Sequence, residues 1–361
     1  MAQTGQTVNR DFLEPEVAVA LSRKTLADFE LNSDESLASY LPSQEVDDIE
    51  YAIDVLDAND EIVVANWRAF GGAVTSEVWG KGGKAYGEFM PLGRNYIVDE
   101  KQRLRQRKDA KNAIAREASD FIIRGTKAVA KEINVQRANA LVHGKLFIQG
   151  SGGMRQTVDF GRRDDFNTTA PQLFTDPAAD PIGYLTDLVD MYEDENGFAP
   201  KEFLMTSRVK RALYTHPKVV LDASRDELAV RAKSGEVDSL LDQFELPPIK
   251  TIGNSQYRKD NLDTGQVESH YLLPQDSIIL SAGSGDAADP LSSPFGRTFW
   301  GPTVSAELPE FGLQNSGGLD VPGIVAAIYD QGWPFNREVI IDALAMPVVF
   351  NPNYTLTAKV I

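Results

Sequence analysis

The chain has 361 residues, of which 42% are hydrophobic and 25% are charged, and these proportions are typical of a folded globular protein. It contains no cysteine, which excludes disulfide bonds, thiolate nucleophiles and cysteine-ligated metals. Its formal charge of −17 disfavours contact with nucleic acid phosphates except at a local basic patch.

Residues 1–50 carry three basic and eleven acidic side chains, with scattered apolar residues such as Phe12, Val17 and Phe29. Such a segment is too polar to form a core alone, yet its apolar side chains are unfavourable in water. We therefore predict an arm that lies along another surface, for example that of a neighbouring subunit. The alternative is a terminus that frays.

Residues 66–94 combine seven glycines with five aromatic residues. Glycine at this density permits turns and weakens a helix, whereas the aromatic residues together with Val74 and Val78 favour strands. The pattern predicts a long projecting β-hairpin, and large aromatic groups on such a hairpin need a partner surface. We therefore expect contacts between subunits at Trp67, Phe70, Trp79, Lys81, Lys84, Tyr86 and Phe89.

The longest helical signal runs from Gln102 to His143 and contains no proline. Gly125 within it predicts a bend or a close contact, and Gly144 predicts its end. The apolar residues of this segment recur at helical spacing and predict one buried stripe, formed by Ile114, Ala118, Phe121, Ile122, Val129 and Ile133.

The segment from Lys101 to Phe147 is strongly basic, with twelve Lys or Arg residues against four acidic ones. A basic helix of this kind can bind nucleic acid, pair with acidic surface on another copy of the chain, or simply stay solvated. The acidic charge of the whole chain favours pairing between copies. The candidate contact residues on this segment are Arg103, Arg105 and Arg107.

Short strands and well-punctuated helices follow. Residues 146–148 and 157–160 predict a β-hairpin, and a helix is expected from Asp180, as its N-cap, to Gly197. An α/β lobe over residues 180–285 is then predicted from strands at 203–205, 249–253, 270–274 and 276–283 and from helices at 207–216 and near 225–232.

The C-terminal region returns to β structure. Residues 337–350 are strand-rich, and residues 354–361 alternate Tyr, Leu, Ala and Val with Thr and Lys, which is the period of a half-buried strand. If this end of the chain pairs with the strands near residue 150, the α/β lobe is an insertion between two parts of one domain.

The sequence contains no enzyme motif: it lacks G-x-S-x-G, H-E-x-x-H and a G-x-G-x-x-G between strand and helix. Its histidines, His143, His216 and His270, are too far apart for a helical zinc motif. The acidic cluster at 187–195 fits a solvated helix face better than a cation-binding loop, and 162–165 fits a salt-bridged turn. We therefore expect no catalytic residues, no cofactor and no metal.

Five stretches stand out by their order and spacing: GGKAYGEFMP (82–91), VDFGRR (158–163), EFLMTSRVKRALYTHPKV (202–219), NSQYRKDNLDTGQVESHYLLPQD (254–276) and ALAMPVVFNPNYTLTAKVI (343–361). Together they resemble tailed-phage major capsid proteins of the Hong Kong ninety-seven fold, and in particular the lambda-type branch. The resemblance covers residues 50–361 and does not include the N-terminal arm.

This resemblance implies an α+β phage capsid fold. The parts that it implies are an N-terminal arm (1–50), an E-loop hairpin region (51–100), a P-domain with a spine helix and a β-hairpin (101–179), an A-domain (180–330) and a C-terminal return to the P-domain sheet (331–361).

The resemblance also implies self-assembly into hexamers and pentamers of an icosahedral shell around double-stranded DNA, in a virion capsid assembled in the host cytoplasm. The implied partners are further copies of the chain, a separate scaffold, a portal and a decoration protein, with DNA in weak nonspecific contact and no membrane. Two alternatives stay open: an encapsulin-like protein compartment, and an α/β enzyme that uses carboxylates alone.

Overall fold

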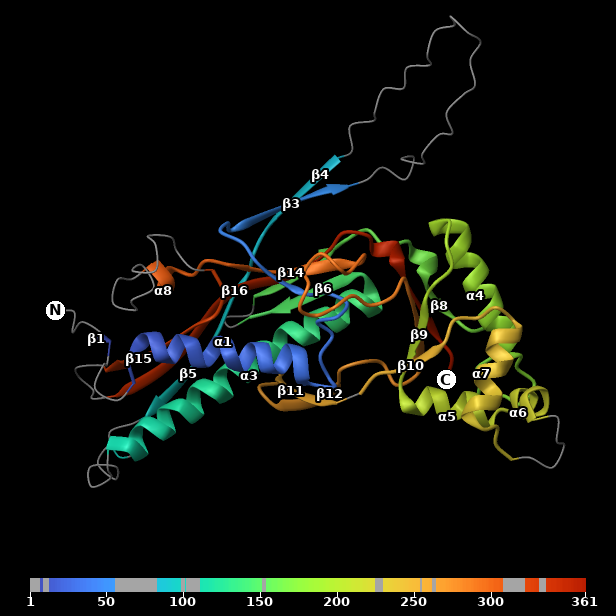
Figure 1. Cartoon of the computed structure of the whole chain (residues 1–361), viewed down its shortest axis with the longest axis horizontal. Helices are drawn as coiled ribbons and strands as arrows, with labels where there is room; N and C mark the ends of the chain where they lie inside the picture. The colour runs from blue at the N-terminus through green and yellow to red at the C-terminus, as the bar shows by residue number, and fades with distance from the viewer. Residues whose placement is uncertain are drawn as a thin grey trace, which may run out of the picture.

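The computed structural model describes residues 7–8, 13–55, 83–98, 101, 111–150, 154–224, 230–253, 255–261, 264–307, 322–330 and 336–361. In Figure 1, two long helices, α1 (Pro15–Asn32) and α3 (Lys111–His143), lie along one part of the body. Four shorter helices gather at its other end, around a second sheet. A two-stranded ribbon projects away from both parts.

The larger sheet has six strands among the described residues, and its longest strand is β16 (Arg337–Val349). β16 pairs antiparallel with three strands, which confirms the strand predicted at 337–350. Strands β1 and β2 extend the sheet by pairing with β15 and β14. The other members are β1 (Thr7–Val8), β2 (Ser43–Glu45), β5 (Pro91–Val98), β14 (Gly296–Gly301) and β15 (Val325–Asp330).

Helix α3 is about 50 Å long at 1.5 Å per residue and packs across β16 and β5. Its predicted apolar stripe is confirmed at Ala118, Ile122, Val129 and Ile133, which are buried against the six-stranded sheet. Gly125 marks a close contact, because a Cβ at this position would lie 2.3 Å from Ile341 Cδ1. The helix ends at Gly144, which has the positive φ of +66° that glycine tolerates.

The described part of the predicted N-terminal arm lies on its own chain. Residues 15–32 form α1, which packs on α3 and β15, and its Ala18 and Val19 are almost fully buried there. Pro15 occupies the first helical turn, where the backbone N–H that proline lacks would have no acceptor within the helix. This part of the arm therefore packs on a surface of its own subunit.

A buried polar network joins the arm, the long helix and the larger sheet. Arg137 of α3 has a side chain that is 1% exposed, and its Nη2 lies 2.6 Å from Glu30 Oε1 of α1. The same guanidinium donates from Nη2 to Ser43 Oγ at 2.9 Å and from Nε to Thr298 Oγ1 at 2.9 Å. Trp300 Nε1 also donates to Ser43 Oγ. Every charge of the buried pair is thus hydrogen-bonded, which a buried ion pair requires.

The second sheet has five strands, in the order β10, β9, β13, β17, β8. Four helices cover one of its faces, and one hydrophobic core joins them to the sheet. Its strands are β8 (Asn167–Thr169), β9 (Glu202–Met205), β10 (Ile249–Thr251), β13 (Ser277–Ser281) and β17 (Thr355–Lys359), and its helices are α4 (Pro181–Asn196), α5 (Ser207–Thr215), α6 (Pro217–Ser224) and α7 (Ser234–Gln243). The short helix α8 (Val304–Glu307) lies near the other sheet.

The capping signals of α4 are confirmed. The Asp180 side chain accepts a hydrogen bond from Gly183 N, Pro181 begins the helix, and Gly197 ends it with a φ of +71°. The apolar stripe of α4 is buried, at Leu185, Leu188, Val189 and Tyr192. These signals act within one or two helical turns, so the sequence alone places this helix.

The lobe differs from its prediction at two places. Residues 225–229 of the helix predicted near 225–232 lie outside the described residues, and residues 230–232, which lie between α6 and α7, are not helical. Pro217 does not only end α5 but also begins α6, since proline suits a first helical turn. The strand predicted at 270–274 belongs to β12 (Val267–Tyr271), which pairs with β11 (Gln256–Asp260) outside the five-stranded sheet.

The C-terminal strand also differs from the prediction. β17 pairs with β13 and β8, whereas the strands near residue 150 pair with each other. β17 is not half-buried, because its first four residues are buried on both faces. Leu356 and Ala358 face the lobe core, while Thr357 Oγ1 donates to the carbonyl of Val142 in α3 at 2.7 Å. The two threonines of β17, Thr355 and Thr357, can be buried because each has a hydrogen-bond partner.

Three two-stranded ribbons leave the sheets. They are β3–β4 (Glu50–Val55 with Gly83–Glu88), β6–β7 (Lys145–Gln149 with Arg155–Asp159) and β11–β12. Within the described residues, none of these strands pairs with a third strand. The β6–β7 ribbon confirms the hairpin predicted around residue 150.

Candidate functional site

The ribbon β3–β4 is anchored to the body at its base and projects from it (Figure 1). The ring of Phe89 stacks between Tyr51, at a centroid distance of 5.9 Å, and Phe299, at 5.8 Å. Phe89 N donates to the carbonyl of Ile49 at 2.9 Å, which continues the pairing of the ribbon into the body. A two-stranded ribbon is marginally stable alone in water, so its projecting part gains stability from any surface that covers it.

Phe89 corrects one prediction. It was expected to be exposed on an isolated subunit, but its side chain is 5% exposed and lies in a core cluster of its own chain. The reason is its position, because Phe89 is the first residue after β4 and reaches back to β14. It acts as the anchor of the ribbon and not as a contact at its tip.

The remaining candidates on the hairpin and the basic segment stay predictions. Lys84 and Tyr86 lie on β4, opposite Asp54 and Ala52 of β3. The others lie outside the described residues, namely Trp67, Phe70, Trp79, Lys81, Arg103, Arg105 and Arg107.

The described part of the basic segment divides into two groups. Arg137, Lys131 and Lys145 pair with acidic residues of the same chain, and Lys145 Nζ lies 2.7 Å from Asp159 Oδ2. The hydrogen bond from Lys145 holds the pKa of Asp159 below its usual range. The second group is exposed on α3 and pairs with no carboxylate in the described residues; it consists of Arg116, Arg124 and Lys127. Part of the basic charge is therefore neutralised within the subunit.

The turn at 162–165 contains two arginines with opposite environments. Arg163 forms the salt bridge predicted within the turn, with Asp165 at 2.6 Å, and a further one with Glu195 of α4; these hydrogen bonds raise its pKa. Arg162 is instead buried and contacts no carboxylate in the described residues; burial lowers its pKa to about 10. Its guanidinium donates to the carbonyls of Leu141 and Val142, the last turn of α3. It thus satisfies helix-terminal acceptors that have no partner within the helix.

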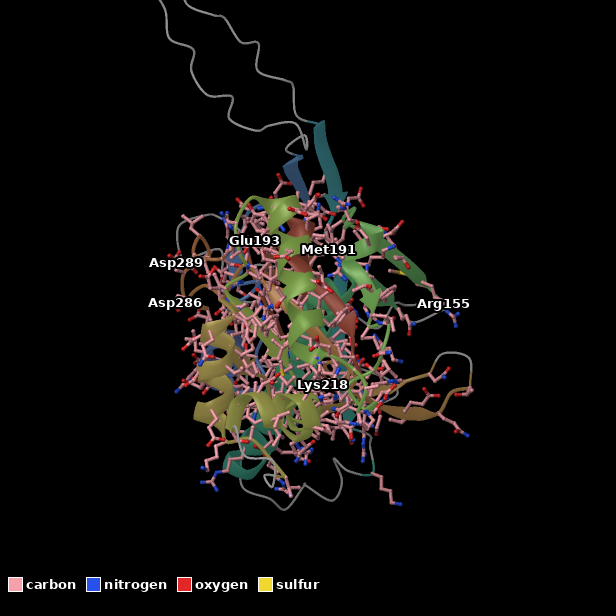
Figure 2. All side chains as sticks on the ribbon, turned by 90° about the vertical axis from the view of Figure 1, so that its right-hand side faces the viewer. Arg155, Met191, Glu193, Lys218, Asp286 and Asp289 are labelled. Carbon is pink, nitrogen blue, oxygen red and sulfur yellow. The ribbon has the colours of Figure 1, made fainter. Side chains whose placement is uncertain are left out.

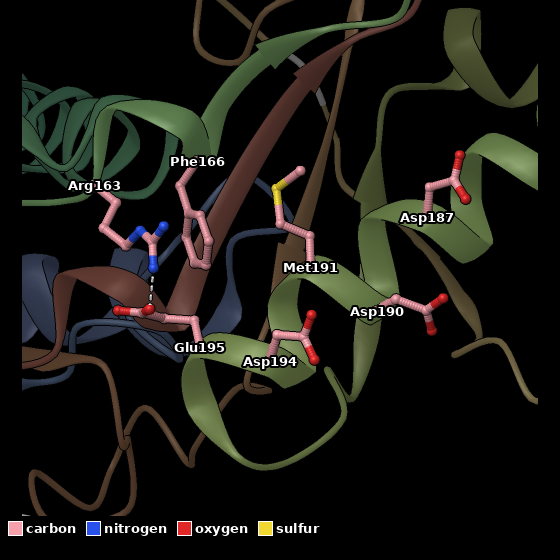
Figure 3. Close-up of a pocket in the computed structure, with 7 residues that line it drawn as sticks. All are labelled: Arg163, Phe166, Asp187, Asp190, Met191, Asp194 and Glu195. Atoms are coloured by element: carbon pink, nitrogen blue, oxygen red, sulfur yellow. Dashed lines mark hydrogen bonds and ion pairs between the residues drawn. The ribbon is translucent and has the colours of Figure 1, made fainter.

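The acidic cluster on α4 forms the solvated face that the sequence predicts. Asp187, Asp190 and Asp194 are exposed, and together with the half-buried Met191 they line one side of a groove of about 420 Å³. Phe166, Arg163 and Glu195 complete the groove (Figure 3). Within the described residues, no three His, Cys, Asp or Glu side chains lie close enough to hold a metal ion.

A basic counterpart escaped the sequence reasoning. Helix α5 presents Arg208 and Arg211 to solvent, with Lys210 half-buried, and none of these pairs with a carboxylate in the described residues. The signal that identifies it is the run from Ser207 to Leu221, which has four Lys or Arg residues and no acidic residue. This run is a second basic stretch, separate from the basic segment at 101–147.

Two asparagines in the turn before β17 have their amides engaged. Asn353 Nδ2 donates to Glu195 Oε1 at 2.9 Å, and its Oδ1 accepts from Arg163 N at 3.1 Å. Asn351 Nδ2 donates to the carbonyl of Pro294 at 3.0 Å. Both amides are therefore held by groups of their own chain.

In the part of the chain that the structure describes, every helix is too short or too polar to cross a membrane.

The sequence matches no protein-family model and no curated protein. In structure, the chain is similar to a putative capsid protein of a prophage from E. coli CFT073, with a TM-score of 0.57 and 14% identity over 94% of this chain and 96% of that one. It is also similar to a phage-related protein from Bordetella bronchiseptica RB50, with a TM-score of 0.53 and 12% identity over 98% and 97% of the two chains.

Both similarities extend over nearly the whole of each chain. At 14% and 12% identity, what is shared is the fold. This agrees with the α+β class that the sequence resemblance implies. The chain therefore has the fold of phage capsid proteins of the Hong Kong ninety-seven type.

Proposed function

We propose that the chain is a major capsid protein, which assembles through its own surfaces into hexamers and pentamers of an icosahedral shell around double-stranded DNA. The observation that carries this proposal is the fold shared with the putative prophage capsid protein over 94% of this chain. The division into arm, E-loop, P-domain, A-domain and C-terminal return belongs to the proposal. So do the virion location and the scaffold, portal and decoration partners.

The shape of the subunit supports self-association. The ribbon β3–β4 extends from the body (Figure 1), and Phe89 at its base packs on Tyr51 and Phe299. Such a projection costs stability in an isolated subunit and is stabilised when a second subunit buries it. In this proposal the hairpin residues Trp67, Phe70 and Trp79 supply that contact.

Electron microscopy of the purified protein tests the proposal. Uniform closed shells that retain DNA support it. Uniform shells loaded with protein cargo instead indicate an encapsulin-like compartment. A small monodisperse monomer, or a monomer that catalyses a reaction at its carboxylates, contradicts the proposal.

Trp79→Ser is expected to impair assembly while leaving the subunit folded, because the proposal places this ring in a contact between subunits. Sedimentation velocity measures assembly, and thermal unfolding of the unassembled subunit measures stability. Phe89 is unsuitable for this test because it lies in the core. Normal shells from the Trp79→Ser variant would show that the hairpin is not an inter-subunit arm.

The shell is expected to contain no covalent cross-links. A cross-link between subunits would need a lysine of the hairpin to attack an asparagine amide, which requires a deprotonated amine held within about 3 to 3.5 Å. The asparagines of the turn before β17, Asn351 and Asn353, already hydrogen-bond within their own chain. Particles boiled in detergent should therefore run as one band at the chain mass of 39.7 kDa. A ladder of multimers, with peptides joining Lys81 or Lys84 to Asn351 or Asn353, contradicts this expectation.

A further inference from the structure

Helix α4 carries a concentrated negative face. The stretch from Asp180 to Pro200 has six acidic residues and no Lys or Arg. Asp187, Asp190 and Asp194 follow at intervals of three and four residues, so they stand above one another on one side of the helix. The groove beside them has an apolar floor at Phe166 and Met191 (Figure 3). Arg163 is its one basic lining residue, and its partners are Asp165 and Glu195.

Helix α5 carries the complementary face. Arg208 and Arg211 are exposed, one turn apart, and Lys218 follows at the start of α6. Arg211 Nε donates to the carbonyl of Ser207 in its own helix, and Lys210 lies over the ring of Tyr214. Exposed cations so close together repel one another, and an acidic surface removes that repulsion.

The two faces lie at opposite edges of the five-stranded sheet. Helix α5 follows β9 and packs against it, next to the edge strand β10. Helix α4 packs near the turn before β17 and against Phe166, which precedes the other edge strand, β8. In Figure 2, Met191 and Glu193 of α4 lie above Lys218 of α6, whose Nζ donates to the carbonyl of Ala178 just before α4.

We propose that the acidic groove of α4 receives the basic face of α5 from a second copy of the chain, which deepens the proposed function and rests on it. Charge complementarity identifies the occupant. Arg208 and Arg211 are spaced by about one helical turn on α5, and Asp190 and Asp194 have the same spacing on α4. Because the faces lie at opposite edges, one neighbour cannot satisfy both. Each subunit then contacts two neighbours head to tail, and a head-to-tail contact that closes gives a ring.

The test uses two reversed variants of the full chain. The first carries Arg208→Glu with Arg211→Glu, and the second carries Asp190→Lys with Asp194→Lys. All four side chains are exposed, so the substitutions leave the fold intact, which circular dichroism checks. Each variant alone is expected to associate about tenfold more weakly than the parent chain in sedimentation velocity, because like charges then meet at the contact.

Mixing the two reversed variants gives the sharper result. In a mixture, each contact again joins opposite charges when the variants alternate around the ring. Alternation closes only in rings with an even number of subunits. We therefore expect the mixture to recover hexamers but not pentamers, and to form open or tubular lattices instead of closed icosahedral shells in electron micrographs.

A matched control carries Asp238→Lys with Asp242→Lys on α7, which are exposed acidic residues of the same lobe with the same change in charge. This control is expected to assemble as the parent chain does. Assembly of either reversed variant at the parent level, or failure of the mixture to recover hexamers, overturns the α4–α5 contact. So does loss of DNA retention with intact assembly in the α5 variant, because that result assigns α5 to DNA. If the parent chain itself forms no shells, the proposed function fails too.

Discussion

Arg137→Met is expected to lower the free energy of unfolding of the subunit by about 3 to 5 kcal/mol, the usual cost of breaking a buried ion pair. The substitution leaves Glu30 with a buried carboxylate and no cation, and it removes the donors to Ser43 and Thr298. These partners lie on α1, β2 and β14, so the loss affects the junction of the arm with the larger sheet. Urea unfolding of the unassembled subunit measures the effect.

Lys131→Met is the matched control on the same helix. Lys131 also pairs with a residue of the arm, Glu35, but at 3.9 Å and with a side chain that is 48% exposed. Solvent screens such a pair, so the loss is expected to stay below about 1 kcal/mol. Adding Glu30→Gln to Arg137→Met should recover part of the loss, because it removes the unpaired charge. Equal effects from Lys131→Met and Arg137→Met would contradict the role given to the buried network.

Arg162→Met is expected to cost about 2 to 4 kcal/mol, because it leaves several buried acceptors without a donor. Arg162 Nη1 donates to Leu141 O at 3.1 Å and to Thr355 Oγ1 at 3.0 Å, and Nη2 donates to the carbonyl of Val142 and to Asn167. Although burial lowers its pKa to about 10, the guanidinium is charged at neutral pH. Its contacts join the end of α3 to strands of the second sheet.

The neighbouring Arg163→Met provides the control. Arg163 makes more ion pairs than Arg162, but its side chain is 48% exposed, so its loss is expected to cost less than about 1 kcal/mol. Amide hydrogen exchange adds a local measurement, since Arg162→Met should speed exchange at the last turn of α3 and in β17. Faster exchange confined to α4 would instead assign the stabilising role to Arg163 and its partner Glu195.

The candidate contact surface was only partly accessible from the sequence. The glycine and aromatic pattern predicted a hairpin within residues 66–94, and β4 lies in that stretch, but its partner β3 precedes it and residues 91–94 belong to β5 of the larger sheet. The pattern did not separate Phe89, which anchors the ribbon, from the residues toward its tip. The reason is that Phe299 and Tyr51, which bury Phe89, are far from it in sequence. The basic face of α5 was missed because the longer basic segment of α3 dominated the charge count.

The sequence by itself determined the features that depend on a few consecutive residues. Asp180 and Gly197 bound α4, Gly144 ends α3, and the apolar stripe of α3 identifies its buried face. Each of these rests on hydrogen bonds or side-chain neighbours within about one or two helical turns, and the residue types alone specify them.

Only the tertiary structure decided which strands pair and which polar groups are buried. The partners of β17 are residues 167–169 and 277–281, and no local pattern in five residues selects them over the strands near residue 150. Arg162 and Arg163 are adjacent and identical in type, yet one is buried under α3 and the other is exposed beside α4. Burial depends on chain segments that are distant in sequence, because desolvation of a charge is acceptable only where the assembled fold supplies its hydrogen-bond partners.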